Sequence, residues 1–334
     1  MKSMALTVLA TGVVVAVLGA PVALAQSGDT AEAHRAAAKA AAGQDFVGLL
    51  SSVCPEPRAQ TAPAGPRRQG PPPASEWHVE PVKVFDNLYF VGQSEYSAWA
   101  VSTSDGIIVI DTIFDYSVED EVVNGLKKLG LDPSKIKYAI VSHGHGDHSG
   151  GAKFLQDRFG TRILMSAADW DLLDRQTNGG LGQPKPKRDM VVTDGQKLTL
   201  GDTTLTMYLT PGHTPGTIST LIPVKDHGAP HLVAEWGGTG FNFTITPDRD
   251  RLYWFDTYIT SAEKFRDIAA KAGADVIIAN HSNLDGSKTK LQLLTERQPG
   301  DRNPYVVGAD GVRRYLTVAD ECARAGLVAL KGRP

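Results

Sequence analysis

The sequence predicts an α/β fold in which layers of helices cover mixed β-sheets. The composition is that of a globular protein, because 42% of the 334 residues are hydrophobic and 21% are charged. These values exclude collagen-like, disordered and disulfide-scaffold proteins. Short apolar runs rich in β-branched residues alternate with segments of helical periodicity, and some runs are separated only by tight turns. The interleaving of strands, helices and hairpins indicates layers rather than a bundle or a barrel.

Individual elements follow from local signals. GIIVID at 106–111 is an apolar run between turn residues, which indicates a buried strand. A helix is expected at 117–129, with Ser117 as N-cap, acidic residues in the first turn and Gly130 as the stop. The alternation at 197–209 predicts a hairpin. Further strands are expected at 82–91, 98–101, 137–141, 162–165, 217–224, 231–234 and 275–279, and further helices at 154–159, 167–174, 261–272 and 288–296.

Residues 1–25 have the pattern of a signal peptide. Lys2 precedes an uncharged apolar run, Pro21 follows it, and Ala23-Leu24-Ala25 fits the small-x-small cleavage rule. We expect cleavage before Gln26, a periplasmic or secreted protein, and no stable membrane association after cleavage. The alternative is an uncleaved membrane anchor, because the run is nearly long enough to span a bilayer.

The remaining chain divides into three parts. Residues 26–75 hold an Ala-rich surface helix within 27–45, an apolar stretch at 46–53 and a Pro/Gly/Arg-rich exposed loop. Residues 76–300 form the expected main α/β domain, and 301–334 are expected to form a helical C-terminal extension.

Cys54 and Cys322 are the only cysteines of the chain. In an oxidising compartment we expect them to form a disulfide that ties the N-terminal segment to the C-terminal helix. Two separate buried thiols are the alternative.

The charge balance restricts the partners. Lys and Arg number 34 against 37 Asp and Glu, so there is no basic excess to neutralise phosphates. Nucleic acid is therefore not an expected partner, and a small-molecule substrate is. The oligomeric state is left open.

A dense cluster of histidines follows the strand expected at 137–141. Its sequence is His143-Gly144-His145-Gly146-Asp147-His148. Imidazole and carboxylate are ligands of Zn²⁺ or another borderline divalent metal, and the intervening glycines let a tight loop aim successive side chains at one point. Open α/β sheets place their sites at the carboxyl ends of strands, where this loop begins. Two further histidines, His213 and His281, occupy loops after expected strands and complete two sets of three ligands.

His143-x-His145-x-Asp147-His148, the turn around His213 and the final His281 resemble the metallo-β-lactamase superfamily, and most closely its third subclass. The resemblance spans about residues 79–294 and implies a four-layer αββα sandwich of two mixed sheets with helices outside. It also implies two Zn²⁺ per chain. The first would be held by His143, His145 and His213, the second by Asp147, His148 and His281. Asp147 is the expected catalytic residue, because it could hold the nucleophile in line.

The chain departs from this family at one stretch. Glyoxalase II and many lactonases carry a metal-bridging Asp between the last two ligand histidines, and the third subclass usually has an Asp-Ser pair there. This chain has Glu235-Trp236-Gly237 instead, and Glu235 is a candidate substitute for the bridging Asp. Subclasses with a Cys ligand are excluded, because both cysteines lie far from the motifs. The candidate substrate contacts are Trp236, Thr239, Asn242, Ser282, Asn283 and Lys288.

The expected function is an exported dinuclear zinc hydrolase. Attack by metal-bound hydroxide would open the β-lactam ring of penicillins and carbapenems, an activity that gives antibiotic resistance. The alternative is hydrolysis of lactones or other esters on the same metals. The remaining hypotheses are an iron-dependent sulfur dioxygenase and a non-catalytic zinc-binding protein. A non-catalytic zinc site is typically closed and rich in cysteine, and the sequence lacks such a site.

Overall fold

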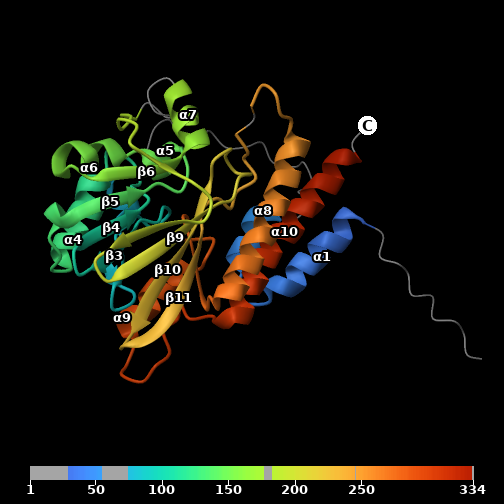
Figure 1. Ribbon diagram of the computed structural model, residues 1–334. Coiled ribbons are helices and arrows are strands. Elements are labelled where there is room, and N and C mark those ends of the chain that lie inside the picture. Colours follow the sequence, from blue (N-terminus) through green and yellow to red (C-terminus); the bar gives the residue numbers. More distant parts are fainter. Residues whose placement is uncertain (1–28, 55–73, 177–182, 245, 333–334) are drawn as a thin grey trace, which may run out of the picture.

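The computed structural model describes residues 29–54, 74–176, 183–244 and 246–332 (Figure 1). The expected signal peptide, 1–25, and nearly all of the Pro/Gly-rich loop lie outside these ranges. Within the described ranges, no helix has both the length and the apolar character needed to cross a bilayer.

The first sheet contains seven strands that neighbour one another in chain order. Its first four strands pair antiparallel, and pairing is parallel from the fourth strand to the seventh. The strands are β1 (Val82–Lys83), β2 (Leu88–Phe90), β3 (Trp99–Thr103), β4 (Gly106–Ile110), β5 (Ile136–Ile140), β6 (Arg162–Ser166) and β7 (Met190–Val192).

The second sheet has five strands in the order β12-β11-β10-β9-β8. All neighbours pair antiparallel except β11 and β12, which are parallel. The expected hairpin at 197–209 is confirmed, since Leu200 pairs with Thr203 around Gly201, whose φ of 53° suits glycine. The strands are β8 (Gln196–Leu200), β9 (Thr203–Leu209), β10 (Ile218–Asp226), β11 (Ala229–Trp236) and β12 (Val276–Ala279).

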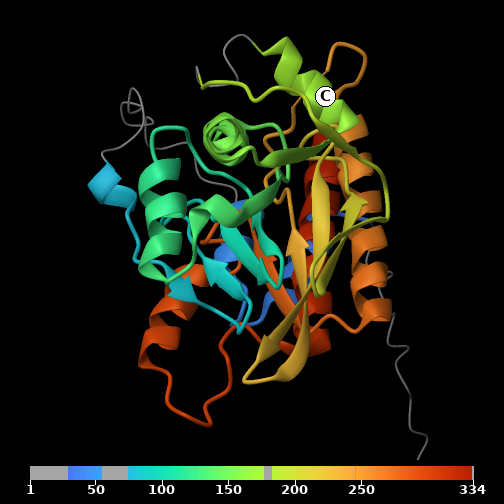
Figure 2. The same ribbon diagram turned by 60° about the vertical axis from the view of Figure 1, so that its left-hand side comes forward.

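Helices cover the outer face of each sheet, with α4 and α6 on the seven-stranded side and α1, α8 and α10 on the other (Figures 1 and 2). The α-helices are α1 (Ala31–Ala42), α2 (Val47–Val53), α3 (Ala74–Trp77), α4 (Asn124–Lys128), α5 (Gly146–Ser149), α6 (Ala152–Phe159), α7 (Ala167–Arg175), α8 (Arg251–Ala272), α9 (Ser287–Glu296) and α10 (Gly308–Lys331). A π-helical turn, Glu119–Val123, precedes α4, and a 3₁₀ turn, Pro133–Lys135, precedes β5.

Three apolar clusters separate the four layers. Successive side chains of a strand point to opposite faces, so Ile108 of β4 packs between the sheets while Ile107 packs under the helices of the first sheet. In the same way Ile278 of β12 lies between the sheets and Ile277 packs against α8 and α10. Each fully buried side chain of this size contributes roughly 1.5–3 kcal/mol through the hydrophobic effect. The expected αββα sandwich is therefore confirmed.

Some local expectations need correction. The N-terminal helix is not simply a surface helix, because Ala38 and Ala42 of α1 are buried against α10. The hydroxyl of Ser117 donates to the carbonyl of Phe114 and caps no helix, since the following turn is π-helical rather than α-helical. The run at 82–91 is interrupted by a turn between β1 and β2. The helix expected in the C-terminal segment is present as α10, and it packs in the helical layer of the second sheet.

The predicted disulfide is confirmed. Cys54, at the end of α2, is bonded to Cys322 of α10, with 5.3 Å between the two Cα atoms. The bond joins segments that are 268 residues apart in the sequence. It fastens the α1–α2 segment to the helical layer.

Candidate metal centre

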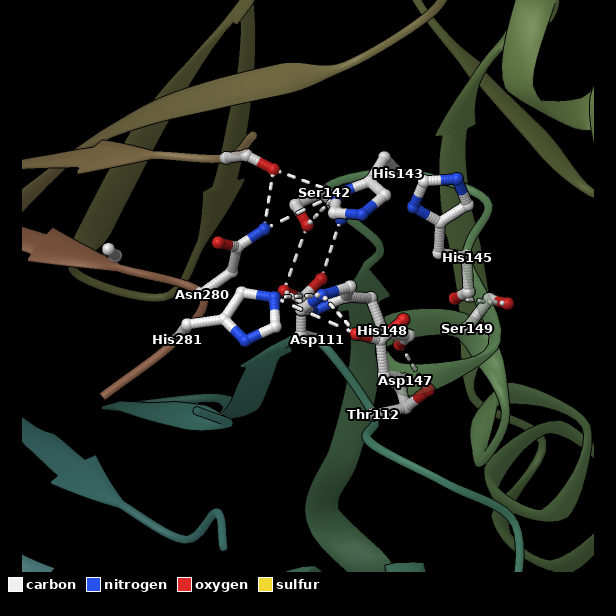
Figure 3. A network of polar contacts seen from close by, with 12 residues as sticks. Asp111, Thr112, Ser142, His143, His145, Asp147, His148, Ser149, Asn280 and His281 are labelled. Carbon is white, nitrogen blue, oxygen red and sulfur yellow. Dashed lines mark hydrogen bonds and ion pairs between the residues drawn. The ribbon is translucent and has the colours of Figure 1, made fainter. Parts of the chain in front are cut away.

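Three segments at the carboxyl ends of strands bring the six expected ligands together. The loop after β5 carries His143 and His145, and α5 carries Asp147 and His148 (Figure 3). His213 lies in the loop after β9, and His281 is the second residue after β12. Within each set of three, the ligand atoms lie within 4.8 Å of one another. The two sets are those expected from the sequence.

The first group, His143, His145 and His213, presents nitrogen lone pairs to one point. The Nδ1–H groups of His143 and His213 donate to the carbonyls of Gly237 and Gly240, each at 2.8 Å, and this leaves both Nε2 atoms unprotonated. Nδ1 of His145 lies 3.0 Å from Nε2 of His213. His143 Nε2 is buried and has no hydrogen-bond partner among the described residues.

The second group, Asp147, His148 and His281, converges in the same way. His148 Nε2 lies 3.3 Å from Asp147 Oδ2 and 3.3 Å from His281 Nε2. The Nδ1–H of His148 donates to Asp111 Oδ2 at 2.9 Å, so this ring also turns Nε2 toward the centre.

Burial sets the protonation states of most of these ligands. Desolvation lowers the pKa of His143 well below its usual value, that of His213 to about 3 and that of His281 to about 4. For His148 burial acts in the same direction, but Asp147 and Asp111 on either side raise its pKa to about 10. The pKa of Asp147 is lowered: burial opposes ionisation, but the neighbouring His148 overcomes it.

The donor set fits divalent zinc. Neutral imidazoles and one carboxylate are zinc ligands, and three protein ligands per ion leave a coordination position open, as in catalytic sites. The buried Nε2 of His143 has no hydrogen-bond partner among the described residues, and a cation held together with His145 and His213 would accept its lone pair.

Asp111 supports the second group from behind. Oδ1 accepts the N–H of Ser142 at 2.7 Å, and Oδ2 accepts both the Ser142 hydroxyl, at 2.8 Å, and His148 Nδ1–H. The residue has a φ of 59°, a left-handed conformation that non-glycine residues seldom adopt and that clusters at functional sites. Sequence reasoning treated Asp111 only as the end of a buried strand.

Asp169 joins two of the ligand loops. Its buried carboxylate accepts the N–H of Gly144 at 2.8 Å, the N–H of Gly216 at 2.8 Å and the hydroxyl of Thr214 at 2.7 Å. Gly144 lies between two ligands of the first group, and Thr214 follows the third. The residue fixes the spacing of the loops and was also missed from the sequence, where it is one of several acids of an expected helix.

An open pocket of about 470 Å³ lies over both ligand groups. The expected contacts Thr239, Asn242 and Asn283 line it, together with Tyr96 and Gln176, which the sequence did not indicate. The ring of Tyr96 lies 5.1 Å from that of His281, and burial raises the pKa of its hydroxyl to about 12. Tyr96 therefore stays a hydrogen-bond donor at neutral pH.

Three other candidates lie elsewhere. Trp236 is a correction: it is 0% exposed, its Nε1–H donates to the Tyr258 hydroxyl at 3.2 Å, and it packs in the helical layer because strand alternation turns it away from the site. Ser282 is also buried outside this pocket, and its hydroxyl donates to the Ser94 carbonyl. Lys288 pairs with Glu95 and does not line this pocket.

Glu235 does not join either ligand group. Its carboxyl group is buried without a hydrogen-bond partner among the described residues, and desolvation, followed by the charge of Asp111, raises its pKa well above the usual value. The expectation that it substitutes for a bridging Asp is not met in this structure.

Comparison with known proteins agrees with this geometry. Residues 91–227 match the sequence model of the metallo-beta-lactamase superfamily. A subclass B3 metallo-beta-lactamase of Bradyrhizobium japonicum superposes with a TM-score of 0.61 and 28% identity, covering 72% of this chain and 90% of that enzyme. The fold also matches a metallo-beta-lactamase from Legionella gormanii, with a TM-score of 0.66 and 23% identity over 76% of this chain and 98% of that one.

Curated relatives match over shorter segments. An N-acyl homoserine lactonase of a Bacillus species is 31% identical over 126 residues, which is 37% of this chain and 48% of that protein. A hydroxyacylglutathione hydrolase of Acidiphilium cryptum is 34% identical over 87 residues, covering 26% of this chain and 31% of the relative. The chain thus spans about half the length, or less, of these two relatives. Residues 91–227 thus match the metallo-beta-lactamase superfamily in sequence, and the four-layer fold and the two ligand groups agree with that match.

Proposed function

We propose that this protein is a dinuclear zinc hydrolase that opens the β-lactam ring of penicillins and carbapenems. The observation that carries the proposal is the pair of ligand groups, each with three protein ligands, at the floor of one open pocket. When bound, zinc would supply Lewis acidity and lower the pKa of water to near neutrality.

The residues of the chain have separable tasks. Asp147 lines the pocket and its lowered pKa keeps it ionised, so it orients a nucleophilic water by accepting a hydrogen bond and donates no proton. The amides of Asn242 and Asn283 and the hydroxyl of Tyr96 lie in the pocket wall and can bind the carbonyl and carboxylate oxygens of a substrate.

The length of the matched segments favours β-lactam hydrolysis over lactone or ester hydrolysis. The subclass B3 enzyme of Bradyrhizobium japonicum matches over 90% of its length, whereas the Bacillus lactonase matches over 48%. The lactonase match is nevertheless a specific reason to retain lactone or ester hydrolysis as the second candidate.

One panel of substrates tests both. The purified zinc-loaded protein is expected to hydrolyse a penicillin and a carbapenem, with inhibition by EDTA and none by clavulanate. Lactam turnover equal to that of the metal-stripped protein, together with rapid hydrolysis of acyl-homoserine lactones or aryl esters, would reject the first candidate and establish the second.

We also propose that the protein is exported, with cleavage before Gln26. The apolar run of residues 5–20, the Ala23-Leu24-Ala25 site and the disulfide support this. N-terminal sequencing of the protein from the periplasm of a bacterial host is expected to begin at or near Gln26. An intact Met1 on membrane-bound protein would contradict export with cleavage.

A further inference from the structure

A second cavity, of about 860 Å³, lies beside the metal-centre pocket and shares Asn283 with it. Its wall comes from three segments that are distant in the sequence: residues 44–48, which lead from α1 into α2; residues 282–293, which lead from the loop after β12 into α9; and residues 302–307 before α10. We call this cavity the α9 pocket. None of the six metal-ligand candidates lines it.

The α9 pocket carries an excess of positive charge. Its ionisable lining residues are Lys288, Lys290, Arg302 and Asp45. Lys288 forms an ion pair with Glu95, and Asp45 forms one with Arg314. The side chains of Lys290 and of the exposed Arg302 form no hydrogen bond or ion pair with any residue that the structure describes. Two cationic side chains in one cavity therefore lack a direct contact with an anionic group of the described residues.

The ammonium group of Lys290 is in an unfavourable environment without such a partner. Nζ is buried and forms no hydrogen bond within the described ranges, and it lies 5.0 Å from the centre of the Tyr305 ring. Burial lowers the pKa of Lys290, and the nearby Asp285 opposes this electrostatically; but Asp285 makes no hydrogen bond to Nζ and instead accepts the N–H groups of Ala279 and Ser287, at 2.9 and 2.8 Å. A ring face compensates a buried ammonium less than an anion does. Rotation of the end of this flexible side chain would bring Nζ to a carboxylate seated against the wall.

The other part of the wall is aliphatic. Val47 and Leu293 are 51% and 49% exposed, and both are among the five large hydrophobic side chains that stand exposed within the described ranges. Pro304, Val306 and Val307 extend this surface. An apolar surface next to unpaired cations suits a ligand with a hydrocarbon part and one anionic group.

We propose that the α9 pocket is a binding site for a small amphipathic organic anion, a carboxylate with an aliphatic chain. The carboxylate binds Lys290 and Arg302, and the chain packs on Val47 and Leu293. This site is separate from the metal centre and does not depend on which substrate is hydrolysed there.

Calorimetric titration of the full-length mature protein with octanoate tests the proposal. One octanoate molecule is expected to bind per protein molecule. Acetate is expected to bind at least tenfold more weakly because it lacks the aliphatic chain, and octanol at least tenfold more weakly because it lacks the negative charge. Because carboxylates also bind zinc, the titration is repeated on protein stripped with EDTA, and octanoate binding is expected to persist.

Variants locate the site. Lys290→Met is expected to weaken octanoate binding at least tenfold, whereas Lys271→Met, at the exposed end of α8, leaves it unchanged. Arg302→Gln is a second variant that weakens binding should Lys290→Met fail to fold. The proposal would be overturned if octanoate and octanol bound equally well, or if octanoate did not bind at millimolar concentration. It would also be overturned if both Lys290→Met and Arg302→Gln bound octanoate like the wild type, or if treatment with EDTA abolished binding.

Discussion

Replacing Asp111 with Asn should weaken the second metal site and leave the first intact. The carboxylate accepts three hydrogen bonds, from Ser142 N–H at 2.7 Å, the Ser142 hydroxyl at 2.8 Å and His148 Nδ1–H at 2.9 Å. An Asn amide has one oxygen and one NH₂ group in place of the two carboxylate oxygens. Its NH₂ group must therefore face one of the groups that now donate a hydrogen bond to Asp111. With NH₂ toward His148, the ring is driven to the tautomer that is protonated on Nε2, the atom needed for the metal.

The alternative orientation is also unfavourable. With its oxygen toward His148, the amide turns NH₂ against the buried backbone N–H of Ser142, and a buried donor left unsatisfied costs about 1–3 kcal/mol. At 1.4 kcal/mol for each factor of ten, this corresponds to a roughly 5- to 150-fold loss of affinity. The range agrees with the 10- to 100-fold typical when a group that orients a metal-ligating histidine is removed.

Competition with a chromophoric zinc chelator measures the two affinities separately. The expected result for Asp111→Asn is a second zinc bound at least fivefold more weakly and a first zinc bound as in the wild type. Asp171→Asn, at an exposed position of α7 paired with Arg188, is the matched control and should change neither affinity. A second-site affinity within twofold of the wild type would refute the tautomer argument.

Three further predictions concern the ligands, the disulfide and a peripheral histidine. The wild-type protein should bind two Zn²⁺ by elemental analysis, His213→Ala should lose mainly the first ion and His281→Ala mainly the second, because their ligand atoms belong to separate groups; a single ion at saturating zinc would contradict this. The double variant Cys54→Ser, Cys322→Ser should lose about 2–5 kcal/mol of unfolding free energy, since the bond closes a loop across 268 residues, and denaturant titration measures it; a loss below the error of the titration would show that α1 and α10 hold together without the bond. Hydrogen bonding to Glu121 raises the pKa of His78, so this contact stabilises the folded state fully below pH 6.5, the unfolded value, and less as pH rises through the folded pKa. His78→Gln should therefore lower the melting temperature more at pH 6 than at pH 9, and an equal effect at both would count against the pair.

The layered fold and the two ligand groups follow from local patterns in the sequence. The histidine cluster, His213 and His281 each follow an apolar strand, and the carboxyl ends of strands are where α/β sheets present side chains. Local signals sufficed because each ligand loop is short and is fixed by the strand before it. The two cysteines of the chain likewise allow only one intramolecular disulfide, and the structure contains it.

The residues that surround those ligands come from segments that are distant in the sequence, and local patterns do not predict them. Proximity to a motif in the sequence suggested Trp236 as a substrate contact, but strand alternation places it in the helical layer, while Tyr96 reaches the pocket from a distant loop. Asp169 lies on a helix 25 residues after Gly144 and 47 residues before Gly216, yet it bonds both. Such contacts depend on how the layers pack against one another. This packing is set by side chains from several segments, and the periodicity of a single segment does not predict it.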